Sequence, residues 1–230
     1  MATLATPSLA QQQHYKIAAK GTKQLIKLYD PLVRTVASDI PATRESKSEC
    51  GAVEEGNTVA FYWPEEQKII VSNQTIEKIG NKYGPEGVAM LVAHEYAHAR
   101  QHAAQGFTRE IIWTSVADEL KADCVAGVYL RRATPIRLTN AMLTRASNFL
   151  ANIGTYLPLE KDWHGTPEMR KYIFLYGYRE GELAQCLAST DMNFNTILND
   201  PGGSLKKQSE EPDNHLNRLL QLGDDILNNK

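Results

Sequence analysis

Apolar side chains recur at helical spacing over much of the 230-residue chain. In residues 8–37, six of them fall on one face of a predicted helix. These six are Leu25, Ile26, Tyr29, Leu32, Val33 and Val36. A second helix is expected at 73–82, ending near Gly84-Pro85. Two further helices are expected from Pro85 to Arg132, with a break near Gly106.

Helices are also expected in the second half of the chain. One covers about residues 136–152 and ends near Gly154. The next begins at Thr166-Pro167-Glu168, where a hydroxyl can cap the helix, proline suits the first turn and the acid lies at the positive end. The pattern over 215–228 predicts a short amphipathic helix.

Two short runs of β-branched and aromatic residues predict a hairpin. They are Thr58–Trp63 and Lys68–Ser72, separated by Pro64–Gln67. The polar residues 39–56 are expected to form an irregular connection. The chain is therefore expected to have an α+β fold, predominantly helical, with a small β-sheet beside the helix that carries the chemistry.

The same patterns divide the chain into four predicted segments. An N-terminal helical segment covers 1–47 and is followed by a core at 48–198. A polar linker at 199–214 then leads to the C-terminal amphipathic helix at 215–230.

Composition narrows the expected classes of partner. Charged residues make up 23% of the chain and the formal net charge is −2, so no nucleic-acid partner is expected. The longest uninterrupted apolar run, Val88–Ala93, is far shorter than the ~20 residues that span a bilayer, and no transmembrane segment is expected. The first ten residues lack the charged start and apolar stretch of a signal peptide. They fit either a cytoplasmic start or a chain that begins just after an export segment.

The segment with the clearest chemistry is His94-Glu95-Tyr96-Ala97-His98. Two histidines four residues apart lie on one helix face, so both imidazoles can reach one metal ion. Glu95 is next to the first histidine, where its carboxylate can act on a metal-activated water. The flanking residues are almost entirely apolar, which indicates a buried helix rather than two solvated histidines. The segment therefore predicts a zinc site of the HExxH type.

A catalytic zinc ion needs three protein ligands and an open position, so a third ligand is expected elsewhere in the chain. Glu119 and Asp123 share a face of the next predicted helix. If Glu119 binds the metal, Asp123 can accept a hydrogen bond from a ligand imidazole and fix its tautomer. Asp118 is the competing ligand, although it points about 100° away around the helix. Without the HExxH segment, Glu119 and Asp123 would indicate only a solvated acidic stripe.

His102 lies four residues beyond His98 but does not complete the longer HExxHxxGxxH pattern. Gln101 and Ala104 occupy the positions where that pattern needs glycine and histidine. We therefore interpret His102 as an ordinary histidine of the surface or the cleft.

Several segments, taken in order, resemble the bacterial neutral zinc metallopeptidase family, whose core is similar to that of gluzincin metalloproteases. They are Cys50-Gly51, Phe61–Pro64, Gln67–Val71, Val92–Gln101, Glu119–Gly127, His164–Arg170 and Gly181–Cys186. Together they cover about residues 48–190.

The resemblance implies a zincin-like fold, one zinc ion per chain, and a peptide or protein as substrate. Carried over by position, His94, His98 and Glu119 are the implied zinc ligands. Glu95 is the implied general base, and Asp123 is the residue that supports a ligand.

The resemblance also suggests roles for residues near the C-terminal end of the core. Cys124 and Cys186 are implied to form a disulfide, the alternative being two buried thiols. In sites of this class a side chain from this region often stabilises the oxyanion. His164 is the first candidate for this role and Arg170 the second. The alternative is that His164 only closes the turn before the next helix.

The chain departs from the family pattern at Trp63, where a cysteine is usual. Cys50 then lacks its expected partner, and we expect it to be a free thiol. Family members are usually membrane-anchored or exported, so a periplasmic, membrane-associated or secreted location is favoured over the cytoplasm.

The sequence thus predicts a zinc metallopeptidase in which Glu95 takes a proton from the attacking water and delivers it to the leaving amine. Strand Lys68–Ser72, as an exposed sheet edge, would bind the substrate backbone. The alternative is a metal-stabilised binding protein with little or no activity, which Trp63 and the spacing around Asn152–Tyr156 favour and the retained Glu95 opposes. A third hypothesis is a helical interaction module built on residues 215–228.

Overall fold

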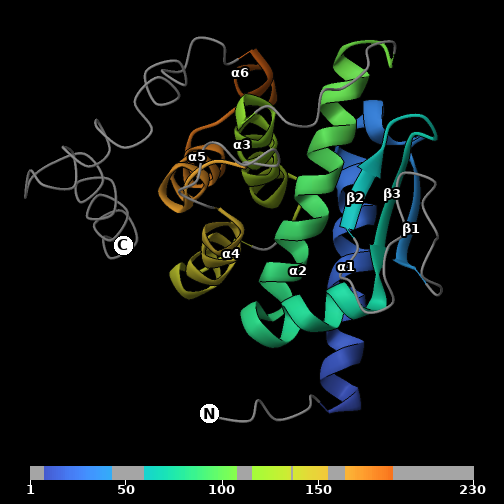
Figure 1. The fold of residues 1–230 in the computed structure, drawn as a ribbon, viewed down its shortest axis with the longest axis vertical. Coiled ribbons are helices and arrows are strands. Elements are labelled where there is room, and N and C mark those ends of the chain that lie inside the picture. The colour runs from blue at the N-terminus through green and yellow to red at the C-terminus, as the bar shows by residue number, and fades with distance from the viewer. Residues whose placement is uncertain (1–7, 43–59, 108–115, 136, 155–163, 189–230) are drawn as a thin grey trace, which may run out of the picture. The chain divides into compact units, whose positions relative to one another are not determined.

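A computed structural model describes residues 8–42, 60–107, 116–135, 137–154 and 164–188 (Figure 1). The fold is α+β and predominantly helical, as predicted, with a three-stranded sheet. The described elements belong to one unit, which ends at Ala188. The predicted linker, the predicted C-terminal helix and Cys50 lie outside the described residues, and the four-segment division stays a prediction.

Helix α1 (Leu9–Tyr29) begins at Ser8 with a capping box, in which Ser8 and Gln11 each hydrogen-bond the other's backbone amide. The prediction of a helix through residue 37 is wrong. Proline disfavours the helical conformation in the residue before it, and Asp30, which precedes Pro31, is extended, with φ −111° and ψ 104°. The Asp30 carboxylate instead caps the short 3₁₀ turn η1 (Pro31–Val33).

The strand order in the sheet is β1-β3-β2. β2 (Ala60–Trp63) and β3 (Lys68–Ser72) form the predicted antiparallel hairpin, and β1 (Ala37–Ala42) runs parallel to β3. β1 was not predicted, because it lies where the pattern indicated the end of a helix and a connection. β3 is the central strand, so the predicted exposed edge at Lys68–Ser72 is wrong. Within the described sheet, β1 and β2 are the two edge strands.

Helix α2 (Asn73–Ala104) follows β3 directly, with Ser72 as its cap. It breaks at Gly84, which has φ 71° and ψ −175°, a conformation that glycine adopts readily. This is the predicted boundary at Gly84-Pro85. Beyond it, α2 packs against α1 and the sheet on one side and against α3 (Val116–Arg132) and α4 (Asn140–Ile153) on the other (Figure 1).

Helix α3 is fixed by two features of its neighbours. α5 (Pro167–Arg179), capped by Thr166 as predicted, approaches so closely that neither Gly127 nor Gly177 has room for a Cβ atom. α6 (Leu183–Ala188) carries Cys186, which forms a disulfide with Cys124 of α3, with Cα atoms 5.5 Å apart. The helix that carries Glu119 is therefore held both by packing and by a covalent bond.

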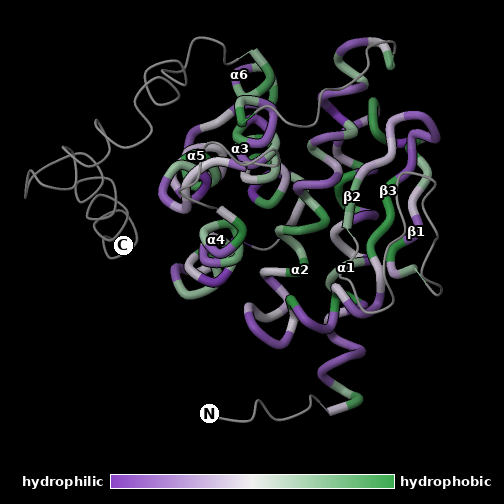
Figure 2. The backbone as a smooth tube through the Cα atoms, in the orientation of Figure 1, coloured by the Kyte–Doolittle hydropathy of each residue, from purple (hydrophilic) through white to green (hydrophobic). Residues whose placement is uncertain are grey.

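Hydrophobic residues concentrate where these elements meet. Figure 2 shows that the middle of β3 is hydrophobic, whereas much of α1 is hydrophilic. Among the described helices, none has a stretch both long and apolar enough to cross a membrane.

Candidate metal centre

His94, His98 and Glu119 meet in the interior, where their exposed fractions are 6%, 4% and 6%. The two histidines lie on successive turns of α2, and Glu119 lies in the first turn of α3. The two Nε2 atoms are 3.1 Å apart, and each is 3.3 Å from a carboxylate oxygen of Glu119. Within the described part of the chain, these residues are the one cluster of this kind that could hold a metal ion.

The spacing of these three groups fits a zinc ion. Zinc–nitrogen and zinc–oxygen bonds of about 2.0–2.1 Å at tetrahedral angles place neighbouring ligand atoms about 3.3 Å apart. Glu119 Oε2 is also buried without a hydrogen bond, although Arg170 Nη2 lies 3.5 Å away, so this oxygen keeps a lone pair for a metal ion. Imidazole and carboxylate ligands suit zinc, and they also suit manganese, cobalt and nickel.

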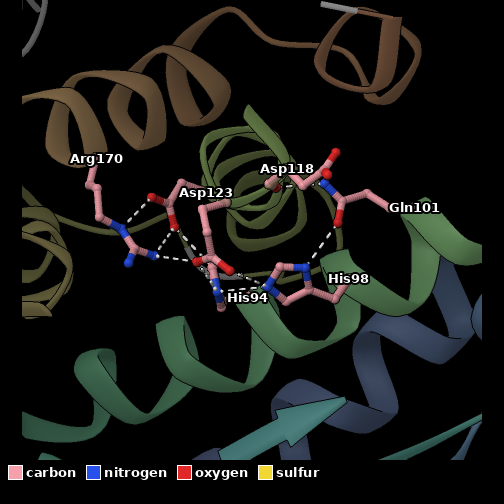
Figure 3. Close-up of polar contacts among 7 residues, drawn as sticks. His94, His98, Gln101, Asp118, Asp123 and Arg170 are labelled. Carbon is pink, nitrogen blue, oxygen red and sulfur yellow. Dashed lines mark hydrogen bonds and ion pairs between the residues drawn. The ribbon is translucent and has the colours of Figure 1, made fainter. Parts of the chain in front are cut away.

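Each imidazole is oriented through its other ring nitrogen (Figure 3). His94 Nδ1 lies 2.9 Å from Asp123 Oδ1, and His98 Nδ1 lies 2.9 Å from Gln101 Oε1. Gln101 Nε2 donates to the backbone carbonyl of Asp118 at 2.7 Å, so its Oε1 must be the acceptor and His98 Nδ1 the donor. With Nδ1 protonated, the Nε2 lone pair of His98 points into the site, as metal binding requires.

Arg170 of α5 holds Asp123 from behind (Figure 3). Its Nε and Nη2 atoms lie 2.8 and 2.9 Å from the two carboxylate oxygens, and both residues are fully buried. Nη2 is also 3.5 Å from Glu119 Oε2. Arg170 does not line the cavity. It therefore compensates the buried charge of Asp123 and is not placed to stabilise the oxyanion as the second candidate after His164.

The pKa values of His94 and Glu119 are set by their contacts with each other and with His98 and Asp123. Burial lowers the pKa of His94, but hydrogen bonds to Asp123 and Glu119 outweigh this and raise the pKa to about 10. Burial raises the pKa of Glu119, but the imidazoles of His98 and His94 outweigh it and hold that pKa well below its ordinary value. Without a metal, a proton therefore stays on His94, and a metal ion must displace it to bind.

Glu95 lies beside the three candidate ligands and is 6% exposed. Burial raises the pKa of its carboxyl group, and this is partly offset by His94, by His98 and by a hydrogen bond from the backbone of Tyr62. A carboxyl group with a raised pKa suits proton transfer near neutral pH.

Glu95 and the candidate ligands line a cavity of about 960 Å³. β2 forms one wall, and the first half of α2 and helix α4 form another. The apolar lining residues include Phe61, Trp63, Ile79, Tyr83, Leu91 and Phe149. His164 also lines the cavity, and burial lowers the pKa of its imidazole. The predicted catalytic pair, Glu95 and His164, therefore borders the same space.

Two sequence-based interpretations change with the structure. Asp118, the competing ligand, is not in the metal-ligating cluster, and its carboxylate lies 3.9 Å from Lys121. His102 is not a histidine of the surface or the cleft. It is 3% exposed, does not line the cavity, and its Nδ1 lies 2.9 Å from the hydroxyl of Tyr62.

Two residues that support the site, Gln101 and Tyr62, were not predicted from the sequence. Gln101 had a local signal, since a residue three positions after His98 lies on the same helix face. Tyr62 had none, because it reaches α2 from a strand far away in the sequence.

One of the comparisons with known proteins gives a match. The sequence model of the family described as "Putative neutral zinc metallopeptidase" matches residues 40–189, which is more than half of the chain. The match includes His94, Glu95, His98, Glu119 and His164. No curated protein and no solved structure has a significant match. The chain therefore belongs to the putative neutral zinc metallopeptidase family.

Proposed function

We propose that this protein is a zinc-dependent peptidase that hydrolyses peptide bonds in peptide or protein substrates. One observation carries the proposal: His94 Nε2, His98 Nε2 and the Glu119 carboxylate converge to within about 3.3 Å beside Glu95, on the wall of one cavity. Membership of the zinc metallopeptidase family supports the same activity.

The residues of the site divide the reaction between them. When bound, a zinc ion would polarise the scissile carbonyl and lower the pKa of a water molecule. Glu95 accepts a proton from the attacking water, a step that its raised pKa favours, and then delivers it to the leaving amine. His164 donates a hydrogen bond to the oxyanion from the same cavity. Asp123 and Gln101 keep both ligand imidazoles oriented throughout.

A peptide fits the cavity better than a small polar molecule does. Its volume of about 960 Å³ lies at the upper end of the range for ligand pockets, and apolar side chains dominate its walls. β2 borders the cavity and is an edge of the described sheet. We therefore assign the addition of an extended substrate to β2 instead of to Lys68–Ser72.

The alternative function is a metal-stabilised binding protein without activity. A structural zinc site is usually closed by a fourth protein ligand. Among the residues that the structure describes, the candidate cluster has three ligands, and the open side meets the cavity. This arrangement favours the peptidase.

We also propose that the protein acts outside the cytoplasm, in the periplasm, at a membrane or as a secreted protein. The support is the Cys124–Cys186 disulfide beside Asp123, because disulfides persist in oxidising compartments and are rare in reducing ones.

The test measures metal content and hydrolysis on the same samples. Wild type should hold about one zinc per chain by elemental analysis, and His98→Ala should lose it. Glu95→Gln should keep the zinc, while hydrolysis of casein or a peptide library falls by at least about 10²-fold. Glu77→Gln is the matched control, because Glu77 lies on the same helix with its side chain 34% exposed.

Two results would contradict the proposal. A zinc-loaded wild type that cleaves none of these substrates would favour the binding protein. Substantial hydrolysis by zinc-loaded Glu95→Gln would exclude Glu95 as the general base.

A further inference from the structure

The end of α2 holds His102 in one position. The Gly106 amide bonds to the Ala103 carbonyl, and the Phe107 amide bonds to the His102 carbonyl. With Gly106 at φ 68°, this is the Schellman motif that ends many helices. Phe107 also has a positive φ, 56°, and its ring packs edge-on against the His102 ring with centroids 5.1 Å apart. The cap therefore fixes the imidazole of His102, which lies one turn beyond the candidate ligand His98.

His102 in turn holds Tyr62 of β2. The Tyr62 hydroxyl lies 2.9 Å from His102 Nδ1, the two rings meet edge-on, and each residue is 3% exposed. Burial lowers the pKa of His102 and raises the pKa of Tyr62. Both groups are therefore neutral near pH 7, so this is a buried hydrogen bond without a net charge.

The backbone of Tyr62 contacts α2 at a second point. A hydrogen bond from this backbone lowers the pKa of the Glu95 carboxyl group, and Tyr62 and Glu95 line the same cavity. Tyr62 thus joins two positions on the same helix: His102 through its hydroxyl and Glu95 through its backbone. β2 is only four residues long and, in the described sheet, pairs with β3 on one side alone. Its pairing with β3 and its contacts with α2 therefore set the position of this strand.

We propose that Tyr62 is a positioning residue, whose hydrogen bond to His102 holds β2 where the Tyr62 backbone orients the Glu95 carboxylate. The proposal rests on the proposed function, which makes Glu95 the general base. A displacement of about 1 Å at a reacting group can reduce a rate about 10²-fold, so a bond remote from the substrate can affect turnover.

The first test needs no substrate. In the full chain, Tyr62→Phe and His102→Phe each remove the bond, and His102→Phe leaves residue 62 unchanged. Hydrogen exchange of the residue 62 amide should become about tenfold faster in both variants, because the strand edge opens more often. Tyr129→Phe is the matched control. It also removes a buried tyrosine hydroxyl, which bonds to Asp30 at 2.8 Å, and it should leave this amide unchanged.

The second test separates positioning from stability. On the zinc-loaded chain, Tyr62→Phe and His102→Phe should each lower kcat about tenfold, with KM within twofold and zinc content unchanged. The double variant should lose no more, because both changes remove one bond. His102→Asn keeps an acceptor near the place of Nδ1 and should recover most of kcat. Tyr129→Phe should lower the melting temperature without lowering kcat.

The two tests fail in different ways. Unchanged exchange of the residue 62 amide in both variants would overturn the proposal. Equal losses of kcat in the Tyr62 and Tyr129 variants would also overturn it, since a general loss of stability would then explain the effect. A zinc-loaded wild type that cleaves nothing would overturn the proposed function. The exchange measurement would still show whether the hydrogen bond between His102 and Tyr62 fixes the position of β2.

Discussion

The second half of α2 is held on its two sides by different chemistry. Toward α3 and α5 the contacts are buried and charged, from His94 through Asp123 to Arg170, with Glu119 beside them. Toward the sheet, the contact between the side chains of Tyr62 and His102 is a neutral hydrogen bond, and the almost completely buried strand β3 lies next to it. Both sides hold the same turns of one helix.

The difference indicates a division between function and stability. Buried charges cost desolvation energy that their mutual attraction only partly returns, so the charged side is a poor source of stability. It is, however, suited to orienting ligands and to exchanging a proton for a metal ion. Apolar packing on the sheet side stabilises the fold whether or not a metal is bound. Changes on the two sides should therefore separate metal affinity from stability.

The largest effect is expected on the charged side, from Asp123→Ala. Arg170 would be left fully buried without its two hydrogen bonds to Asp123, and the free energy of unfolding should fall by about 3–5 kcal/mol. Zinc affinity should fall about 10–100-fold, because His94 loses the group that orients it. Urea unfolding and competition with a chelator measure the two quantities.

A double variant distinguishes the charge from the packing. Asp123→Leu with Arg170→Met removes both charges and should recover much of the stability, but not the zinc affinity. Full zinc affinity in either variant would mean that Asp123 does not orient His94.

On the sheet side, Ile70→Ala should lower stability alone. Ile70 is 1% exposed on the central strand, in a cluster with Ala42, Phe61 and Trp63. The free energy of unfolding should fall by about 2 kcal/mol, near the lower end of the 2–5 kcal/mol range. Phe61 and Trp63 are only partly buried, so they can shift into the space that the Ile70 side chain leaves. Zinc affinity should stay within twofold of wild type. A loss of affinity as large as that of Asp123→Ala would contradict the separation of the two sides.

The charged side was largely predictable from the sequence because its geometry is local. His94, Glu95 and His98 are fixed relative to one another by one helix, and Glu119 and Asp123 by another. Once both helices are recognised, the spacing within each places the side chains on one face. The packing of the two helices against each other, and the contact of Arg170 from α5 with Asp123, could be seen only in the structure.

The sheet side could not be predicted in the same way. The pairing of β1 with β3 joins segments far apart in the chain, and nothing local distinguishes a central strand from an edge strand of similar composition. The contact between Tyr62 and His102 depends on that docking. The end of α1 is different, because Asp30-Pro31 is a local signal for it. The apolar pattern continues through the buried Val33 and Val36, and it outweighed this signal in the prediction.

The smallest of the three effects is a pH dependence confined to the charged side. In the metal-free protein, hydrogen bonds to Asp123 and Glu119 raise the pKa of His94 from 6.5 to about 10. This stabilisation is fully present below pH 6.5, the unfolded value, and is lost as the pH rises toward 10. From pH 7 to 8, the free energy of unfolding should fall by at most about 1.4 kcal/mol, the limit for one proton.

Metal binding should change this slope. The metal takes the place of the proton on His94, so the zinc-loaded protein should lose little stability over the same interval, and the melting-temperature difference between the two forms should widen from pH 7 to 8. His94→Gln is the control, since it removes the titrating group and should abolish the slope of the metal-free protein. Ile70→Ala should keep the wild-type slope at a lower stability, because its change lies on the neutral side. Metal-free wild type whose melting temperature stays constant from pH 7 to 8 would show that the proton on His94 contributes nothing to folding. The charged side would then matter through the metal alone.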